Sequence, residues 1–80
     1  MIKKNKKEHY LPEIGLIGLG RWGEKVVNAC KNISSLKLKC VASRNPDAKE
    51  LIPSDCKIYF DWRDMITFQE LDGVIICTPP

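Results

Sequence analysis

Apolar and polar residues follow one another along this chain in blocks that predict four strands and three helices. Short apolar runs alternate with amphipathic stretches and are separated by polar or proline-containing breaks. Between residues 21 and 33 the apolar stripe of the first helix recurs at helical spacing: Trp22, Val26, Val27, Cys30 and Ile33. The expected strands cover residues 13–17, 36–42, 57–60 and 73–78, and the expected helices cover residues 21–33, 45–52 and 61–66.

The order of these elements predicts an α/β fold. A β-α-β-α-β-α-β alternation is typical of a parallel sheet with right-handed crossovers. In the second strand Leu36, Leu38, Cys40 and Ala42 alternate with lysines, so we expect these four side chains on one face. A complete dinucleotide-binding domain joins two βαβαβ halves. We therefore predict a partial Rossmann-type sheet, with strand order 3-2-1-4, that lacks the second half.

Two polar motifs predict where the later helices begin. In Asn45-Pro46-Asp47 the asparagine has the position of an N-cap, and the proline that of the first helical residue. Asp61, with Asp64 three residues later, predicts the N-cap of the third helix. We expect the aromatic residues around this point in the core: Tyr59, Phe60 and Trp62.

The net charge of +3 lies in the first residues of the chain. Residues 1–12 are predicted to be a flexible basic tail with four lysines, and residues 13–80 to be the folded part, where nine basic and nine acidic residues cancel. A nucleic-acid reader carries its charge on a folded face, so we expect no nucleic-acid partner. No window reaches the roughly 18 apolar residues of a membrane span, and no secretory signal is present. These patterns favour a cytoplasmic protein.

The residues that often perform chemistry do not form a catalytic or metal-binding pattern. The four cysteines lack Cys-x-x-Cys spacing and are expected to be reduced thiols: Cys30, Cys40, Cys56 and Cys77. His9, the only histidine, lies in the tail. We therefore expect no metal site and no catalytic residue within these 80 residues.

The most informative motif is a Gly-x-Gly-x-x-Gly turn between the first strand and the first helix. Gly18 permits a tight turn, Gly20 lets backbone approach a pyrophosphate, and Gly23 lets helix and strand pack closely. The helix N-terminus then offers free N–H groups and partial positive charge to an anion. A dinucleotide partner is predicted, with these candidate contacts: Gly18, Leu19, Gly20, Arg21, Trp22 and Gly23. Trp22 has an alternative role in packing, and Arg21 is dispensable if backbone amides hold the pyrophosphate.

The end of the second strand selects the cofactor in such a fold. Ser43 and Arg44 occupy the place where NAD-binding proteins carry a carboxylate for the ribose. A hydroxyl and a planar cation suit a 2′-phosphate, which predicts NADP, with NAD possible. The alternative is that both residues are ordinary loop residues.

A second candidate region, Thr78-Pro79-Pro80, ends the fourth strand. In strand order 3-2-1-4, strands one and four flank the topological switch point, where ligands bind. Thr78, Pro79 and Pro80 are therefore expected to border the nicotinamide ribose, the alternative being that they only terminate the strand.

Four segments together resemble the N-terminal region of the Gfo/Idh/MocA oxidoreductases: residues 15–23, 40–44, 59–62 and 71–80. The resemblance implies an NAD- or NADP-dependent sugar or polyol dehydrogenase, and Ser43-Arg44 is similar to NADP-preferring members. No residue here matches the family's Glu-Lys-Pro segment with its catalytic lysine, and the C-terminal substrate domain is absent. An oligomer is expected only for a full-length parent.

The last strand would leave an unpaired edge and an uncovered face, which natural proteins normally protect. We therefore expect a fragment of a longer reductase. A non-catalytic nucleotide-binding or regulatory module is the alternative. An S-adenosylmethionine-binding methyltransferase is a third possibility, disfavoured because an acidic residue is usual where Ser43 and Arg44 stand.

Overall fold

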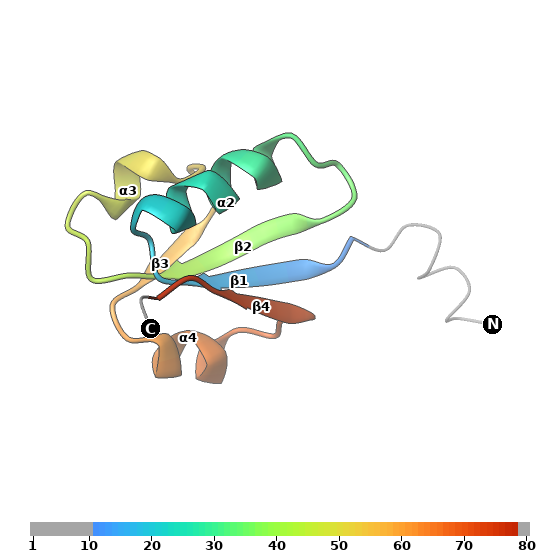
Figure 1. Ribbon diagram of the computed structural model, residues 1–80. Helices are drawn as coiled ribbons and strands as arrows, with labels where there is room; N and C mark the ends of the chain where they lie inside the picture. Colours follow the sequence, from blue (N-terminus) through green and yellow to red (C-terminus); the bar gives the residue numbers. More distant parts are fainter. Residues whose placement is uncertain (1–10, 79–80) are drawn as a thin grey trace.

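The computed structural model describes residues 11–78, which form a four-stranded parallel sheet covered by helices on both faces (Figure 1). The strands lie in the order β3-β2-β1-β4, and all neighbouring pairs are parallel. The elements are β1 Glu13–Ile17, α2 Arg21–Lys31, β2 Lys37–Ala42, α3 Ala48–Leu51, β3 Lys57–Tyr59, α4 Trp62–Phe68 and β4 Gly73–Ile76. The predicted fold class and strand order are confirmed.

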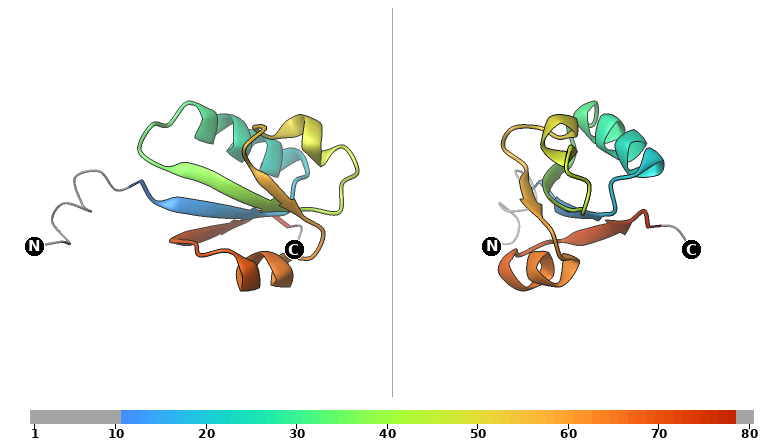
Figure 2. Two further views of the ribbon diagram at one scale, coloured as in Figure 1. Left: turned by 180° about the vertical axis from the view of Figure 1, so that it is seen from behind. Right: turned by 90° about the vertical axis from the view of Figure 1, so that its left-hand side faces the viewer.

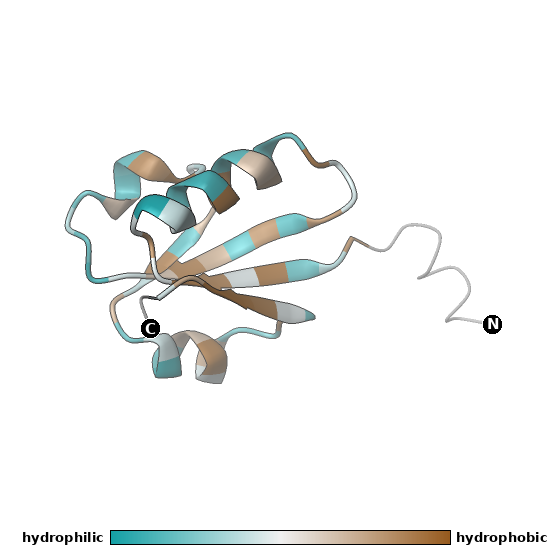
Figure 3. Ribbon diagram, viewed as in Figure 1, coloured by the Kyte–Doolittle hydropathy of each residue, from teal (hydrophilic) through white to brown (hydrophobic). Residues whose placement is uncertain are grey.

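The helices lie in two layers, with α2 and α3 on one face of the sheet and α4 on the other (Figures 1 and 2). This arrangement follows from the topology. The crossovers β1-α2-β2 and β2-α3-β3 move in one direction along the sheet, and β3-α4-β4 returns past β1. Right-handed crossovers in opposite directions place their helices on opposite faces. Apolar residues accordingly concentrate in the strands between the layers (Figure 3).

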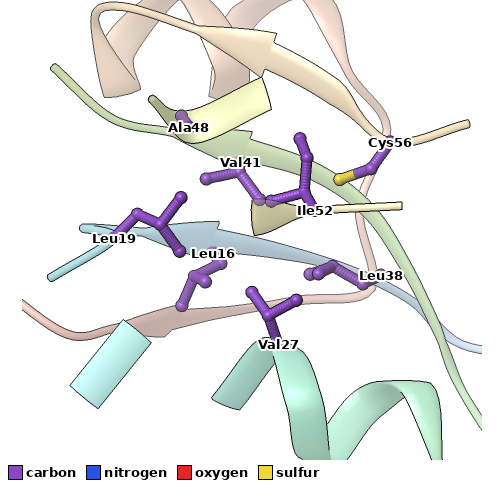
Figure 4. Close-up of a cluster of buried hydrophobic side chains, with 8 residues drawn as sticks. All are labelled: Leu16, Leu19, Val27, Leu38, Val41, Ala48, Ile52 and Cys56. Atoms are coloured by element: carbon purple, nitrogen blue, oxygen red, sulfur yellow. The ribbon is translucent and has the colours of Figure 1, made fainter. Parts of the chain in front are cut away.

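The larger part of the core lies between the sheet and the helices α2 and α3. Val27 of α2 faces Leu16 of β1, and both side chains are fully buried (Figure 4). The complete cluster is Leu16, Leu19, Val27, Leu38, Val41, Ala48, Ile52 and Cys56. The other face is closed by Met65 of α4, which is also fully buried, and which packs with Ile17, Cys40 and Ala42.

The predicted one-sided alternation of the second strand is wrong. Leu38 packs with the α2 cluster, whereas Cys40 and Ala42 pack with Met65 on the opposite face. The register of β1 against β2 shifts between Ile14 and Gly15, and the shift skips one residue of β2. An extra residue of this kind turns the following side chains to the other face of the sheet.

Several predicted boundaries differ from the structure by a few residues. Helix α3, the second helix along the chain, begins at Ala48 after the N-cap Asp47, and Asn45 does not cap it. The Asn45 side chain instead accepts a hydrogen bond from the Asp47 N–H at 2.9 Å, which closes a local turn before the helix. The cap at Asp61 is confirmed, because its carboxylate accepts from the Arg63 N–H.

The remaining differences concern where elements end. Helix α2 ends at Lys31, and Ile33 of the predicted apolar stripe is exposed. Helix α4 continues to Phe68, two residues beyond its predicted end, and β4 ends at Ile76.

None of the helices within residues 11–78 combines the length and apolar character needed to cross a membrane.

Replacing Met65 tests whether one side chain closes the second face of the sheet. Met65→Ala should lower the free energy of unfolding by about 2–5 kcal/mol, because it leaves a cavity under α4. Ile66→Ala is the matched control on the next, exposed position of the same helix and should cost much less. Urea unfolding followed by circular dichroism measures both values. Equal losses would contradict this assignment of the core.

Raising the pH above about 9 should lower the free energy of unfolding through Cys56. Burial raises the pKa of this thiol from 9.0 to about 12, so the unfolded chain loses the proton first. The stability is fully present below pH 9 and is lost as the pH rises through 12, by at most about 1.4 kcal/mol per unit. Urea titrations between pH 8 and pH 11 measure the slope. Cys56→Ala should flatten it, and an unchanged slope would refute the assignment.

Candidate functional site

The carboxyl ends of all four strands are joined at one edge of the sheet. Three backbone hydrogen bonds make these connections: Gly18 N–H to Ala42 C=O at 2.9 Å, Ser43 N–H to Tyr59 C=O at 2.8 Å, and Cys77 N–H to Ile17 C=O at 2.8 Å. The glycine turn, Ser43 and Cys77 are therefore held in fixed positions relative to one another. This is the edge at which ligands bind in open parallel sheets.

Two positions of the glycine turn require glycine because other backbone atoms approach them closely. Gly18 has a φ of +94°, and a Cβ there would lie 3.0 Å from the Cys77 carbonyl carbon. A Cβ on Gly23 would overlap the carbonyl oxygen of Gly18, so the first turn of α2 can sit directly against the end of β1. Both roles predicted for these glycines are confirmed by this geometry.

Gly20 differs from the other two glycines because it faces open space. A Cβ built on Gly20 meets no atom within 4 Å. Gly20 is also the N-cap of α2, and no side chain caps this helix end. The first intrahelical bond of the turn runs from the Glu24 N–H to the Gly20 carbonyl at 2.9 Å, which leaves the preceding N–H groups of the first turn as donors. Such donors, with the helix dipole behind them, attract an anion.

Two hollows lie on either side of this turn and share part of their walls. The first, called the smaller hollow below, has a volume of about 260 Å³ and is lined by Ile17, Gly18, Leu19, Ala42, Ser43, Arg44, Phe60, Trp62 and Thr78. The second, of about 360 Å³, is lined by Gly18, Leu19, Gly20, Arg21, Trp22, Cys77 and Thr78. The predicted site residues that the structure describes are therefore brought together, with Gly23 beneath them. Pro79 and Pro80 lie outside the described residues.

Two hollows of about 380 and 410 Å³ lie elsewhere on the molecule. One adjoins the amino-terminal part of β2, and the other lies between α3 and β3. Neither contains any residue of the glycine turn. Size alone therefore does not distinguish a candidate site, whereas the free backbone N–H groups at the start of α2 do.

Ser43 and Arg44 both face the smaller hollow. The Ser43 hydroxyl oxygen accepts a hydrogen bond from the Asn45 N–H at 3.0 Å, which fixes the side chain and leaves its own O–H available as a donor. Arg44 is exposed, and its guanidinium lies 5.3 Å from the centre of the Phe60 ring. Both residues thus offer donors at the end of β2.

The expectation that Phe60 and Trp62 belong to the core is wrong. Phe60 is 69% exposed and Trp62 is 48% exposed, and both line the smaller hollow. Phe60 directly follows β3 at the carboxyl edge of the sheet, and Trp62 is the first residue of α4. Tyr59, the last residue of β3, does pack against the Met65 cluster. The position of Phe60 and Trp62 between a parallel strand and the next helix was the sequence signal for a place at the site.

Trp22, which was predicted on the apolar stripe of the first helix, is also exposed. Its side chain is 68% exposed, and the Lys25 ammonium lies 4.7 Å from the ring centre. The buried residues of α2 are Gly23 and Val27, and Trp22 does not share their burial. It lines the second hollow together with Arg21.

The sequence analysis did not predict three other residues that line the two hollows: Ile17, Ala42 and Cys77.

Asp61 brings a negative charge to the same edge. Its carboxylate accepts hydrogen bonds from the Arg63 backbone N–H at 2.9 Å and from the Arg63 guanidinium at 3.1 Å. These hydrogen bonds lower the pKa of Asp61, and the charge of Arg44 contributes less. The carboxylate is therefore ionised at neutral pH and engaged by Arg63.

Comparisons with known proteins show the family to which the chain belongs. The model of the oxidoreductase family with an NAD-binding Rossmann fold, Gfo/Idh/MocA, matches residues 13–80. No curated protein sequence gives a significant match. A provisionally assigned oxidoreductase from Magnetospirillum magnetotacticum MS-1 is 38% identical with a TM-score of 0.75, and the match covers 88% of this chain and 23% of that one.

Two solved inositol dehydrogenases are also similar. The myo-inositol 2-dehydrogenase of Lactobacillus plantarum is 27% identical with a TM-score of 0.76. The scyllo-inositol dehydrogenase of Lactobacillus casei, solved with NAD(H) and scyllo-inositol, is 31% identical with a TM-score of 0.71. Each match covers 86% of this chain but 22% of the relative, so the chain spans about a fifth of their length. The chain belongs to the Gfo/Idh/MocA oxidoreductase family, and residues 13–80 are its nucleotide-binding Rossmann region.

Proposed function

We propose that this chain binds NADP in preference to NAD and is the dinucleotide-binding segment of an oxidoreductase that acts on a sugar- or polyol-like substrate. The observation that carries the proposal is the open backbone at Gly20, which lines one of two hollows that share Gly18, Leu19 and Thr78. An elongated ligand with a central pyrophosphate and a nucleoside at each end matches this arrangement.

The pyrophosphate would lie over the first turn of α2. The N–H groups from Leu19 to Gly23 would donate to its oxygens, and Arg21 would add a positive charge. This recognition needs backbone within hydrogen-bond reach of the phosphate, and the absence of a Cβ at Gly20 allows that approach. The residues present therefore fit a dinucleotide.

The cofactor choice rests on Ser43 and Arg44. A 2′-phosphate in the smaller hollow would accept from the free Ser43 O–H and from the Arg44 guanidinium. NAD offers only a 2′-hydroxyl, for which a carboxylate is the usual partner. None of the residues lining this hollow is acidic. The Lactobacillus casei relative was solved with NAD(H), so a preference for NADP would distinguish this chain from that enzyme.

The nicotinamide half would occupy the second hollow, bordered by Trp22 and Thr78, with Pro79 and Pro80 following. A nicotinamide ring supplies hydride transfer when it is bound. In this chain Thr78 would donate from its hydroxyl to the nearby ribose, and the exposed Trp22 would shield the ring from water. A polyol-like substrate is proposed because the solved relatives include two inositol dehydrogenases. A cytoplasmic location is proposed because all four cysteines are free thiols.

Gly20→Ala tests the pyrophosphate site without disturbing the core. The added methyl group has no atom within 4 Å to clash with, so the free energy of unfolding should fall by only about 1 kcal/mol, because alanine is a poorer N-cap than glycine. The methyl group would occupy the space that the phosphate needs, so NADP binding should weaken at least tenfold, about 1.4 kcal/mol. Titration calorimetry measures the affinity, and urea unfolding measures the stability.

Gly73→Ala is the matched control for this substitution. Its Cβ would make an ordinary 3.4 Å contact with Ile14, at the opposite end of β4 from the site. It should leave the NADP affinity unchanged. Undiminished binding by Gly20→Ala would contradict the proposed pyrophosphate position.

Arg44→Ala tests the cofactor choice. It should weaken NADP binding by about 1.5–3 kcal/mol, as expected for a hydrogen bond to a charged group, and should leave NAD binding nearly unchanged. Lys49→Ala removes the same charge from an exposed position on α3 outside this hollow and serves as the control. Calorimetric titrations of the unsubstituted protein and the two variants with NADP⁺ and NAD⁺ measure the six affinities. Equal affinities of the unsubstituted protein for the two cofactors would refute the NADP assignment.

A further inference from the structure

Phe60 is an exposed aromatic ring whose position the core does not explain. Its side chain is 69% exposed, although it directly follows a strand of the sheet. The ring lines the smaller hollow, and the guanidinium of Arg44 lies 5.3 Å from the ring centre.

The sheet itself places these two side chains together. Ala42 of β2 pairs with Tyr59 of β3, and the Ser43 N–H donates to the Tyr59 carbonyl at 2.8 Å. This bond is the last connection between the two strands, so Arg44 and Phe60 leave the sheet side by side. Their contact therefore follows from the register and does not depend on a flexible loop.

A carboxylate could also hold Arg44, but the nearby one is engaged. Asp61 already binds Arg63 through its backbone N–H and its guanidinium. Within residues 11–78 Arg44 forms no ion pair with a carboxylate. An aromatic face attracts a guanidinium without using its five N–H donors, whereas a carboxylate would occupy two of them. Arg44 is thus oriented while its donors stay available.

We propose that Phe60 is a positioning residue that holds the Arg44 guanidinium at the hollow in the orientation that receives a 2′-phosphate. The inference rests on the proposed function, in which Arg44 contacts that phosphate. Phe60 would act on the discrimination between NADP and NAD, because only NADP carries the group that Arg44 binds. Asp61 and Arg63 would support this arrangement by satisfying each other.

The test is the ratio of NADP⁺ to NAD⁺ affinity, measured by calorimetry on the unsubstituted chain and its variants. Phe60→Leu keeps an apolar side chain but removes the aromatic face, and should lower the ratio about two- to fivefold, the range expected for a cation–π contact at an exposed site. Phe60→Tyr keeps the face and should keep the ratio. Phe68→Leu, at an exposed position at the end of α4 outside the hollow, is the matched control and should also keep it.

The same substitution in an Arg44→Ala background tests the coupling. Phe60→Leu should then leave the ratio unchanged, since the side chain that it positions is gone. A similar fall in both backgrounds would overturn the inference, as would an unchanged ratio for Phe60→Leu alone in a protein that prefers NADP. A loss of affinity for both cofactors by the same factor would also overturn it, because that result indicates a purely structural or adenine-binding role of Phe60. An unsubstituted protein with a ratio of one would overturn the cofactor proposal and this inference together.

Discussion

The close approach between the first turn of α2 and the end of β1 is the constraint on which the rest of this structure depends. A Cβ at Gly23 would overlap the Gly18 carbonyl oxygen, so any other residue would push the helix away from the sheet. Because the helix sits so close, Val27 can pack on Leu16, and the N-terminus of α2 opens directly over the strand ends. Core packing and the position of the proposed pyrophosphate site are therefore consequences of one backbone contact.

The second determinant of function is the way β2 and β3 end together. The bond from Ser43 to Tyr59 fixes the direction in which Arg44 and Phe60 leave the sheet. Charge at this edge is arranged so that Asp61 is engaged by Arg63 while Arg44 has an aromatic neighbour. The edge thus combines rigid backbone with a cation whose donors are available, which is what recognition of a phosphate on a ribose requires.

Local sequence patterns predicted the fold and the glycine turn because both depend on short-range chemistry. The alternation of apolar runs with amphipathic segments predicts a parallel α/β sheet, and the strand order is the usual one of a Rossmann-type sheet. Gly18 and Gly23 stand where only glycine fits. The exposure of Trp22, Phe60 and Trp62 was not predicted, because aromatic residues at helical or strand spacing usually lie in the core. Whether such a residue is buried depends on how far the neighbouring layer reaches, and that is a property of the assembled sheet.

The change of face along β2 was not predicted for a similar reason. Apolar residues alternate with Lys37 and Lys39 as far as Cys40, yet the register shift opposite Ile14 and Gly15 sends Leu38 and Cys40 to opposite faces. This alternation does not indicate the shift, since the shift arises from pairing with another strand. Asn45 was mistaken for a cap because its side chain satisfies a backbone N–H in a turn, one step before the helix begins.

The proposed role of the glycine turn is to hold the pyrophosphate of a dinucleotide where two hollows share their walls. A titration of the ¹⁵N-labelled protein with NADP⁺, followed by amide chemical shifts in NMR spectra, tests this role. The largest changes are expected at the amides of residues 18–23, with further changes at residues 43–44 and 77–78. The amides at the opposite end of the sheet, residues 34–38, should remain unchanged. Large changes confined to that opposite end, or no saturable change at the glycine turn, would show that the pyrophosphate does not bind at this turn.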